Sequence, residues 1–271
     1  MSDSTRALAE RGFRWLCAGA ALAPVVVFAA LLAQALIVGV GLADAAALDG
    51  LGRAALASAT LVALAALIAF PLAVSVAVYI QEYADAPGDE RGQGFVARLV
   101  VASVEGLAGV PSVIYGLLGL AVFVGLRGSG AGSQAAGSFA GVMTLAALLM
   151  PVIVASTRRA LAELPAGLRE AGLALGATRW QVIRKLVLPT AMPGILGGAV
   201  SALARGFGEA APLLVLGLVA SEALPVWVFA RSSSAGGGIA GVAALLVVVL
   251  GLDVVALLLA RRRARTLGGA A

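Results

Sequence analysis

Several residue types that carry chemistry in proteins are absent or nearly absent from this 271-residue sequence. It contains no histidine, which removes the commonest metal ligand and the usual general base. Its one cysteine, Cys17, can form neither a disulfide nor a cysteine-based metal site within the chain. The sequence also lacks a G-x-x-x-x-G-K-S/T nucleotide-binding loop. We therefore predict no catalytic residues, no metal site and no cofactor in this chain.

Charged residues make up only 12% of the chain, about half the usual share in soluble domains, while 61% of the residues are hydrophobic. Six apolar runs of about 18 residues or more are each long enough to cross a lipid bilayer as a helix. They cover 15–40, 54–80, 99–126, 139–157, 190–220 and 239–260. The first exceeds the core of a typical signal peptide, so we expect it to remain as an anchor. The sequence thus predicts an all-α, polytopic membrane bundle of about six transmembrane helices.

The basic residues are distributed unevenly between the two sides of this predicted bundle. Fifteen lysines and arginines fall in the two tails and in the loops that follow the second and fourth runs, whereas the opposite side holds only Arg53, Arg127 and Arg231. The positive-inside rule therefore predicts that both termini are cytoplasmic. Because the net charge of +5 is explained by topology, we expect membrane lipid and no nucleic acid as a partner.

The connections differ in length and polarity. The outer connections are too short for a folded domain, so we expect another protein to capture any substrate outside. The first inner connection, 81–98, holds Glu82, Asp85, Asp89 and Glu90 and is interpreted as a solvated loop.

The second inner connection, 158–189, is the longest polar stretch. Pro165 suits a helix start, and Gly176 suits a left-handed cap at its end. Between them, four residues share one apolar face, namely Leu168, Ala171, Gly172 and Leu175. Thr178 and Gln181 form a candidate capping box that predicts a second short helix, with Trp180, Ile183 and Val187 on its apolar face. Such a pair could fill a partner's groove or only anchor the bundle at the membrane surface.

This connection resembles the E-A-A-x3-G-x9-I-x-L-P motif of ABC importer permeases. The matching residues are Glu170, Ala171, Gly176, Leu188 and Pro189. Gly172 stands in place of the second alanine and Leu186 in place of the isoleucine. The resemblance implies that this stretch, with Thr178 at the start of its second helix, couples the membrane helices to a cytoplasmic ATPase.

Four longer stretches resemble phosphate-specific permeases, of the PstA type rather than the PstC type. They are 105–120, 174–196, 202–214 and 223–229, and the resemblance spans roughly 56–260. Ala210 departs from the family's usual threonine. The resemblance implies a type-1 permease domain at 54–260, preceded by 1–53 with the first helix and followed by a basic cytoplasmic tail, 261–271.

The resemblance also implies a set of partners in the bacterial inner membrane. These are a homologous PstC-type permease, a dimeric PstB-type ATPase that binds ATP and magnesium, and an external PstS-type phosphate-binding protein. The function it implies is ATP-driven import of inorganic phosphate.

Four ionisable residues lie inside the predicted membrane runs: Glu105, Arg205, Glu209 and Asp253. Each costs at least about 2.5 kcal/mol at mid-membrane, which makes each a functional candidate. Arg205 and Glu209 are four residues apart, so we expect them on one helix face as an ion pair. In a transport pathway, Arg205 would bind the oxyanion and Glu209 would compete for it. Glu105 could guard the inner exit or cap a helix, and Asp253 could reach the basic tail.

Two other functions fit the same sequence. The chain could be an ABC permease for another oxyanion or for an amino acid. It could also be a secondary transporter or channel that works without an ATPase.

Overall fold

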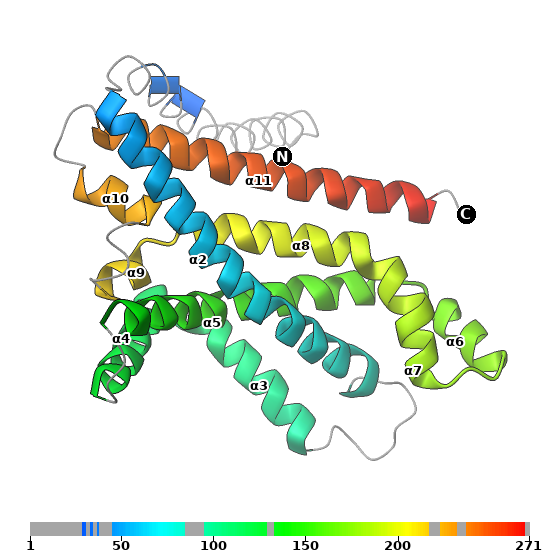
Figure 1. Ribbon diagram of the computed structural model, residues 1–271. Coiled ribbons are helices and arrows are strands. Elements are labelled where there is room, and N and C mark those ends of the chain that lie inside the picture. The colour runs from blue at the N-terminus through cyan, green and yellow to red at the C-terminus, as the bar shows by residue number, and fades with distance from the viewer. Residues whose placement is uncertain are drawn as a thin grey trace, which may run out of the picture.

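The computed structural model describes residues 45–84, 95–128, 133–216, 223–231 and 237–268, together with five positions between 29 and 37. Most of the predicted first run, 15–40, lies outside the described residues, as do Cys17, Asp85, Asp89 and Glu90. Only helices and short connections occur in the ranges that are described. The predicted all-α membrane fold is therefore confirmed for this part of the chain (Figure 1).

The helices follow one another along the chain in this order. They are α2 (Ala45–Val78), the π-helix η1 (Tyr79–Ala84), α3 (Phe95–Gly109), α4 (Ser112–Gly128), α5 (Ser133–Ala162), α6 (Ala166–Ala174), α7 (Arg179–Val182), the π-helix η2 (Ile183–Val187), α8 (Leu188–Gly208), α9 (Ala211–Leu216), α10 (Leu224–Ala230) and α11 (Gly237–Gly268).

Within the described ranges, four helical segments are long and apolar enough to cross a membrane. They are Gly50–Tyr83, Gly137–Ala162, Arg179–Gly208 and Gly241–Leu259. A bent pair, Arg98–Gly109 with Ser112–Gly125, makes a fifth if it counts as one span. The predicted runs 54–80, 139–157 and 239–260 are confirmed, because each coincides with one long helix.

The predicted run 99–126 is not a single straight helix. It is divided into α3 and α4, which are bent by 105° at Val110 and Pro111. Pro111 cannot donate a backbone hydrogen bond, and its ring disfavours helical geometry at the preceding residue. The Tyr115 hydroxyl donates a 2.6 Å hydrogen bond to the Leu107 carbonyl oxygen. The same carbonyl accepts from the Val110 N–H at 3.2 Å, so the Tyr115 hydroxyl is a second donor that links α4 to the last turn of α3.

The predicted run 190–220 is also interrupted, and it begins earlier than expected. A continuous helix runs from Arg179 through η2 and α8 to Gly208. The chain is extended at Glu209, with φ −79° and ψ 100°, before α9 begins. Pro212 therefore lies in the first turn of a new helix, where proline is tolerated, and not at a kink within one helix.

The core is centred on α5, between α2 and α8 (Figure 1). An alanine stripe on α2 (Ala65, Ala69, Ala73 and Ala77) is at most 1% exposed and packs in the same cluster as Leu149 of α5. Small side chains let helix backbones approach closely. The two interrupted helices also meet, since a Cβ on Gly116 of α4 would lie 2.8 Å from the Pro212 backbone of α9.

Candidate functional site: a polar groove and a coupling corner

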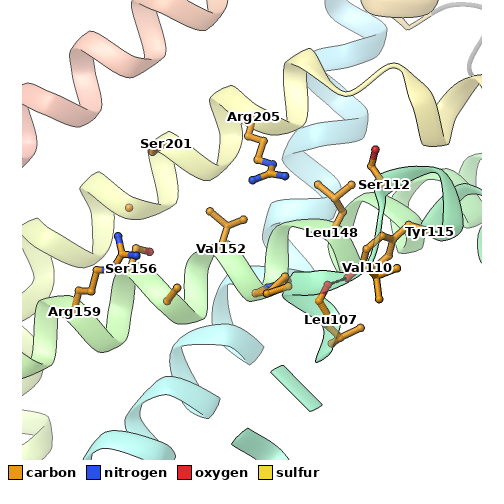
Figure 2. A pocket seen from close by; sticks show the side chains of 14 residues that line it. Leu107, Val110, Ser112, Tyr115, Leu148, Val152, Ser156, Arg159, Ser201 and Arg205 are labelled. Carbon is orange, nitrogen blue, oxygen red and sulfur yellow. Dashed lines mark hydrogen bonds between the residues drawn. The ribbon is translucent and has the colours of Figure 1, made fainter. Parts of the chain in front are cut away.

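A cavity of about 480 Å³ lies between α5, α8 and the bend from α3 to α4 (Figure 2). Its walls are mixed: apolar side chains alternate with hydroxyl and guanidinium groups. The polar side chains that line it are those of Ser112, Tyr115, Ser156, Arg159, Ser201 and Arg205. Among the groove-lining residues no carboxylate occurs. The cavity is therefore suited to an anion rather than to a cation.

Two glycines on α8 set how α5 and α8 cross beside this groove. A Cβ on Gly198 would collide with the side chain of Ser156, and a Cβ on Gly206 would lie 3.2 Å from Leu149 Cδ2. Residue numbers thus rise along α8 as they fall along α5, so the two helices are antiparallel. This register places Arg205 near the level of Leu149 and Ser156 near the level of Gly198.

Arg205 lies in the last turn of α8, and its side chain is 60% exposed. Its Nε lies 3.5 Å from Oε1 of Glu209, whose side chain is 17% exposed. The predicted ion pair is present. The prediction that both residues share a helix face was wrong, because α8 ends at Gly208 and Glu209 is extended. In Figure 2 the Arg205 guanidinium points from α8 toward Val152 across the groove.

The other two ionisable residues predicted inside the membrane do not join this pair. Glu105 is exposed on α3, and Asp253 is partly buried on α11. Neither lines the groove. The structure therefore brings together Arg205 and Glu209 but not Glu105 or Asp253.

The predicted corner at Gly176 is present in detail. Gly176 has a φ of +78°, in the left-handed region that glycine adopts without strain. Its N–H donates to the Leu173 carbonyl at 2.9 Å, and the Ala177 N–H donates to the Gly172 carbonyl at 3.3 Å. These two bonds form a Schellman cap at the end of α6. The capping box of Thr178 and Gln181 then begins α7, so both cap predictions are confirmed.

The helix after this corner differs from the separate short helix that was predicted. It continues without a break through Leu188 and Pro189 into α8, so the corner leads directly into a membrane span. Pro189 lacks the N–H that would bond to the carbonyl of Lys185 one turn earlier. Lys185 lies within the π-helical segment η2, so the helix departs from regular α-helical geometry around the carbonyl that has lost this bond.

The predicted apolar faces are buried only in part. Ile183 and Val187 are at most 1% exposed, as expected, but Trp180 is 55% exposed. On α6, Gly172 is buried against Val182 and Leu186, whereas Leu175 is 88% exposed because it lies at the helix end.

Three large apolar side chains near this corner are exposed. They are Leu173, Leu175 and Trp180, which are 50%, 88% and 55% exposed. Glu170 and Ala171, from the E-A-A motif, are also exposed, on α6.

The inner face of the corner is held by a buried ion pair that the sequence did not reveal. Arg169 Nη2 lies 2.7 Å from Glu82 Oε1, and Arg169 Nε lies 3.0 Å from Oε2. The Glu82 side chain is 5% exposed, so its interpretation as part of a solvated loop was wrong. Arg169 also donates to the carbonyls of Leu161 and Leu164. The Arg179 guanidinium lies 5.2 Å from the ring centre of Tyr83, beside Glu82.

Residues 90–265 match the model of the family described as "Binding-protein-dependent transport system inner membrane component". The chain belongs to this family. Its members are non-catalytic, multi-pass subunits of the inner membrane that carry no cofactor, which confirms the predictions that the chain is a permease subunit and not an enzyme.

Similar family members include proteins with two kinds of name. The chain is 39% identical over 151 residues to the probable ABC transporter permease protein YqgH of Bacillus subtilis, covering 54% of this chain and 45% of that protein. It is 39% identical over 152 residues to the phosphate transport system permease protein PstA 1 of Mycobacterium tuberculosis, covering 56% and 45%. The match thus spans about half the length of each curated relative.

Solved permeases share the fold. A bacterial ABC transporter involved in the import of the acidic polysaccharide alginate matches with a TM-score of 0.63. The match is 18% identical and covers 96% of this chain and 99% of the other.

Three residues that the sequence argument left without a role now have a defined place. Arg159 lines the groove, and Arg169 and Glu82 hold the corner. The sequence offers one signal for the role of Glu82: it is the first charged residue after Arg53 and follows closely on a long apolar run.

Proposed function

We propose that this chain is the PstA-type permease subunit of an ATP-driven importer of inorganic phosphate. The observation that carries the proposal is that Arg205 lines the polar groove and forms an ion pair with Glu209. The relatives named as phosphate permeases support the choice of anion.

The geometry of the pair suits transient binding of an oxyanion. A guanidinium can donate two parallel hydrogen bonds to phosphate oxygens, and the Nε of Arg205 lies 3.5 Å from Glu209 Oε1. Because Glu209 is a competing anion, phosphate is held too weakly to be trapped, as passage through a transport site requires. The hydroxyls of Ser112 and Ser201 offer further hydrogen bonds along the groove.

The corner supplies the proposed contact with the ATPase. Leu173, Leu175 and Trp180 are exposed apolar side chains that a cleft in a PstB-type ATPase dimer would cover. Glu170, Ala171, Gly172 and Gly176 shape α6 and its cap, while Thr178, Leu188 and Pro189 lie on the helix that continues into the membrane. Movement of the ATPase would therefore reach α8 and Arg205 through one continuous helix.

The remaining parts of the proposal follow from charge and from the family. Both termini lie in the cytoplasm, as the distribution of arginines predicts. The complete importer contains a PstC-type permease, an ATPase dimer that binds ATP and magnesium, and a PstS-type binding protein outside.

Uptake of radiolabelled phosphate by cells that express the assembled transporter tests this function. Arg205→Ala should lower uptake about 10- to 100-fold, which corresponds to the loss of one or two charge-assisted hydrogen bonds. Arg184→Ala removes a charge from the exposed side of η2 and should leave uptake near the parent level. Copurification of the partner subunits shows that each variant assembles.

Three outcomes would contradict the proposal. Normal uptake by Arg205→Ala would exclude Arg205 from the pathway. Competition by molybdate, sulfate or an amino acid that exceeds competition by phosphate would assign another substrate. Phosphate movement by the isolated chain in liposomes, without nucleotide or ATPase, would identify a secondary transporter or channel.

A further inference from the structure

Arg159 is the second guanidinium that lines the groove. In the sequence it is one of many cytoplasmic-side arginines, and topology alone accounts for it. In the structure it is exposed on α5 and extends beside Ser156, at the opposite end of the groove from Arg205 (Figure 2). No carboxylate of the described residues forms an ion pair with it.

The helix register gives the spacing between the two arginines. Ser156 on α5 lies at the level of Gly198 on α8. Arg159 is three residues beyond this level in one direction, and Arg205 is seven residues beyond it in the other. At 1.5 Å per residue, their Cα atoms are about 15 Å apart along the groove. Ser156 and Ser201 line the stretch between them.

This spacing suits two successive anion sites better than one shared site. The long side chains can extend toward each other, but each guanidinium lies at its own end of the groove (Figure 2). Glu209 offsets part of the charge of Arg205, whereas Arg159 keeps its full charge within the described residues. A tetrahedral oxyanion released by Arg205 therefore meets a more positive potential toward Arg159.

We propose that Arg159 forms a second, inner anion site that receives the oxyanion from Arg205 before its release to the cytoplasm. The identity of the anion as phosphate rests on the proposed function above. The existence of the inner site rests on the groove and its two guanidinium groups. Successive weak sites let an ion move on, because no single site holds it strongly.

Thiol labelling in the assembled transporter tests the inner site without requiring transport. The background is Cys17→Ser, and Ser201→Cys places one thiol in the groove between the two arginines. The measurement is the ratio of the rates at which an anionic and a cationic methanethiosulfonate react. Arg159→Gln should lower this ratio on the order of tenfold, because a nearby positive charge attracts the anionic reagent and repels the cationic one.

Arg184→Gln is the matched control for this measurement. It removes the same charge from η2, 17 residues before the thiol at position 201 and thus about 25 Å away along the helix. That distance exceeds the Debye length of about 8 Å at physiological salt, so the ratio should not change. Arg205→Gln should lower the ratio as Arg159→Gln does. A ratio that responds to Arg205→Gln but not to Arg159→Gln would overturn the inner site.

Phosphate uptake gives the second readout. Arg159→Gln should lower the maximal rate at least tenfold without changing assembly, and Arg159→Lys should restore part of it because the positive charge is retained. Normal uptake by Arg159→Gln would also overturn the proposal. A third outcome separates the inner site from the proposed function: the labelling ratio falls in both Arg159→Gln and Arg205→Gln, but inorganic phosphate neither slows labelling nor is transported. In that case the assignment of phosphate as the substrate fails, while the two anion sites in the groove are retained.

Discussion

The ion pair of Arg169 and Glu82 makes the sharpest prediction about stability. It joins α6 to η1 at the C-terminal end of α2. Glu82 is 5% exposed, and Arg169 supplies its hydrogen bonds through both Nε and Nη2. Arg169→Met would keep much of the side-chain volume but leave the Glu82 carboxylate buried without its partner.

The expected cost follows from that uncompensated charge. Removing one partner of a buried ion pair typically costs about 3–5 kcal/mol, because the remaining charge is desolvated and unpaired. Replacing both partners by apolar residues of similar size is often nearly neutral. The double variant, Glu82→Leu with Arg169→Met, should therefore lie within about 2 kcal/mol of the parent. That allowance covers the lost hydrogen bonds to the carbonyls of Leu161 and Leu164.

The assay is unfolding of the full-length chain by sodium dodecyl sulfate in mixed micelles, followed by helical circular dichroism. Arg184→Met on η2 serves as the exposed control and should change the free energy of unfolding by no more than about 0.5 kcal/mol. A double variant as unstable as Arg169→Met alone would refute the reasoning, since the loss would then reflect missing contacts and not an unpaired charge.

Two glycine substitutions test the corner and the packing of the interrupted helices. Gly176→Val should cost about 1–2 kcal/mol, because a left-handed φ of +78° is strained for any residue with a Cβ, and less ATPase should copurify. Gly167→Val is the control, because Gly167 lies in α6 with no positive φ and no atom within 4 Å of an added Cβ, and this variant should retain the ATPase. If Gly167→Val loses as much copurifying ATPase as Gly176→Val does, the conformational explanation is contradicted. Gly116→Val should cost at least about 1–3 kcal/mol in unfolding free energy, because its Cβ would meet the Pro212 backbone at 2.8 Å. Gly106→Val has no atom within 4 Å of the new Cβ, and an equal loss there would rule out the steric cause.

Features that depend on near neighbours in the chain were predictable from the sequence. The runs 54–80, 139–157 and 239–260 form spans because apolar length alone determines whether a helix can cross a bilayer. Gly176 and the pair of Thr178 and Gln181 cap their helices because cap hydrogen bonds join residues within one turn or two.

Both interruptions of the spans were harder to predict. Pro111 and Pro212 are visible signals, but membrane helices often contain proline, as α2 does at Pro71 and α5 at Pro151. Apolar residues dominate on both sides of each interruption, so the length of an apolar run could not separate a tolerated proline from a break. The packing of α4 against α9 provides partners for the shortened helices.

The sequence by itself therefore determined the membrane class, most of the spans and the helix caps at the Gly176 corner. Only the tertiary structure decided which charged groups act together. Arg169 and Glu82 are 87 residues apart, and Arg159 faces the groove of Arg205 from a different helix. Periodicity shows which side chains share a helix face, but not which helix crosses that face or at what register. Close packing sets the crossing and the register at positions such as Gly198, where the absence of a Cβ lets α8 approach Ser156 of α5.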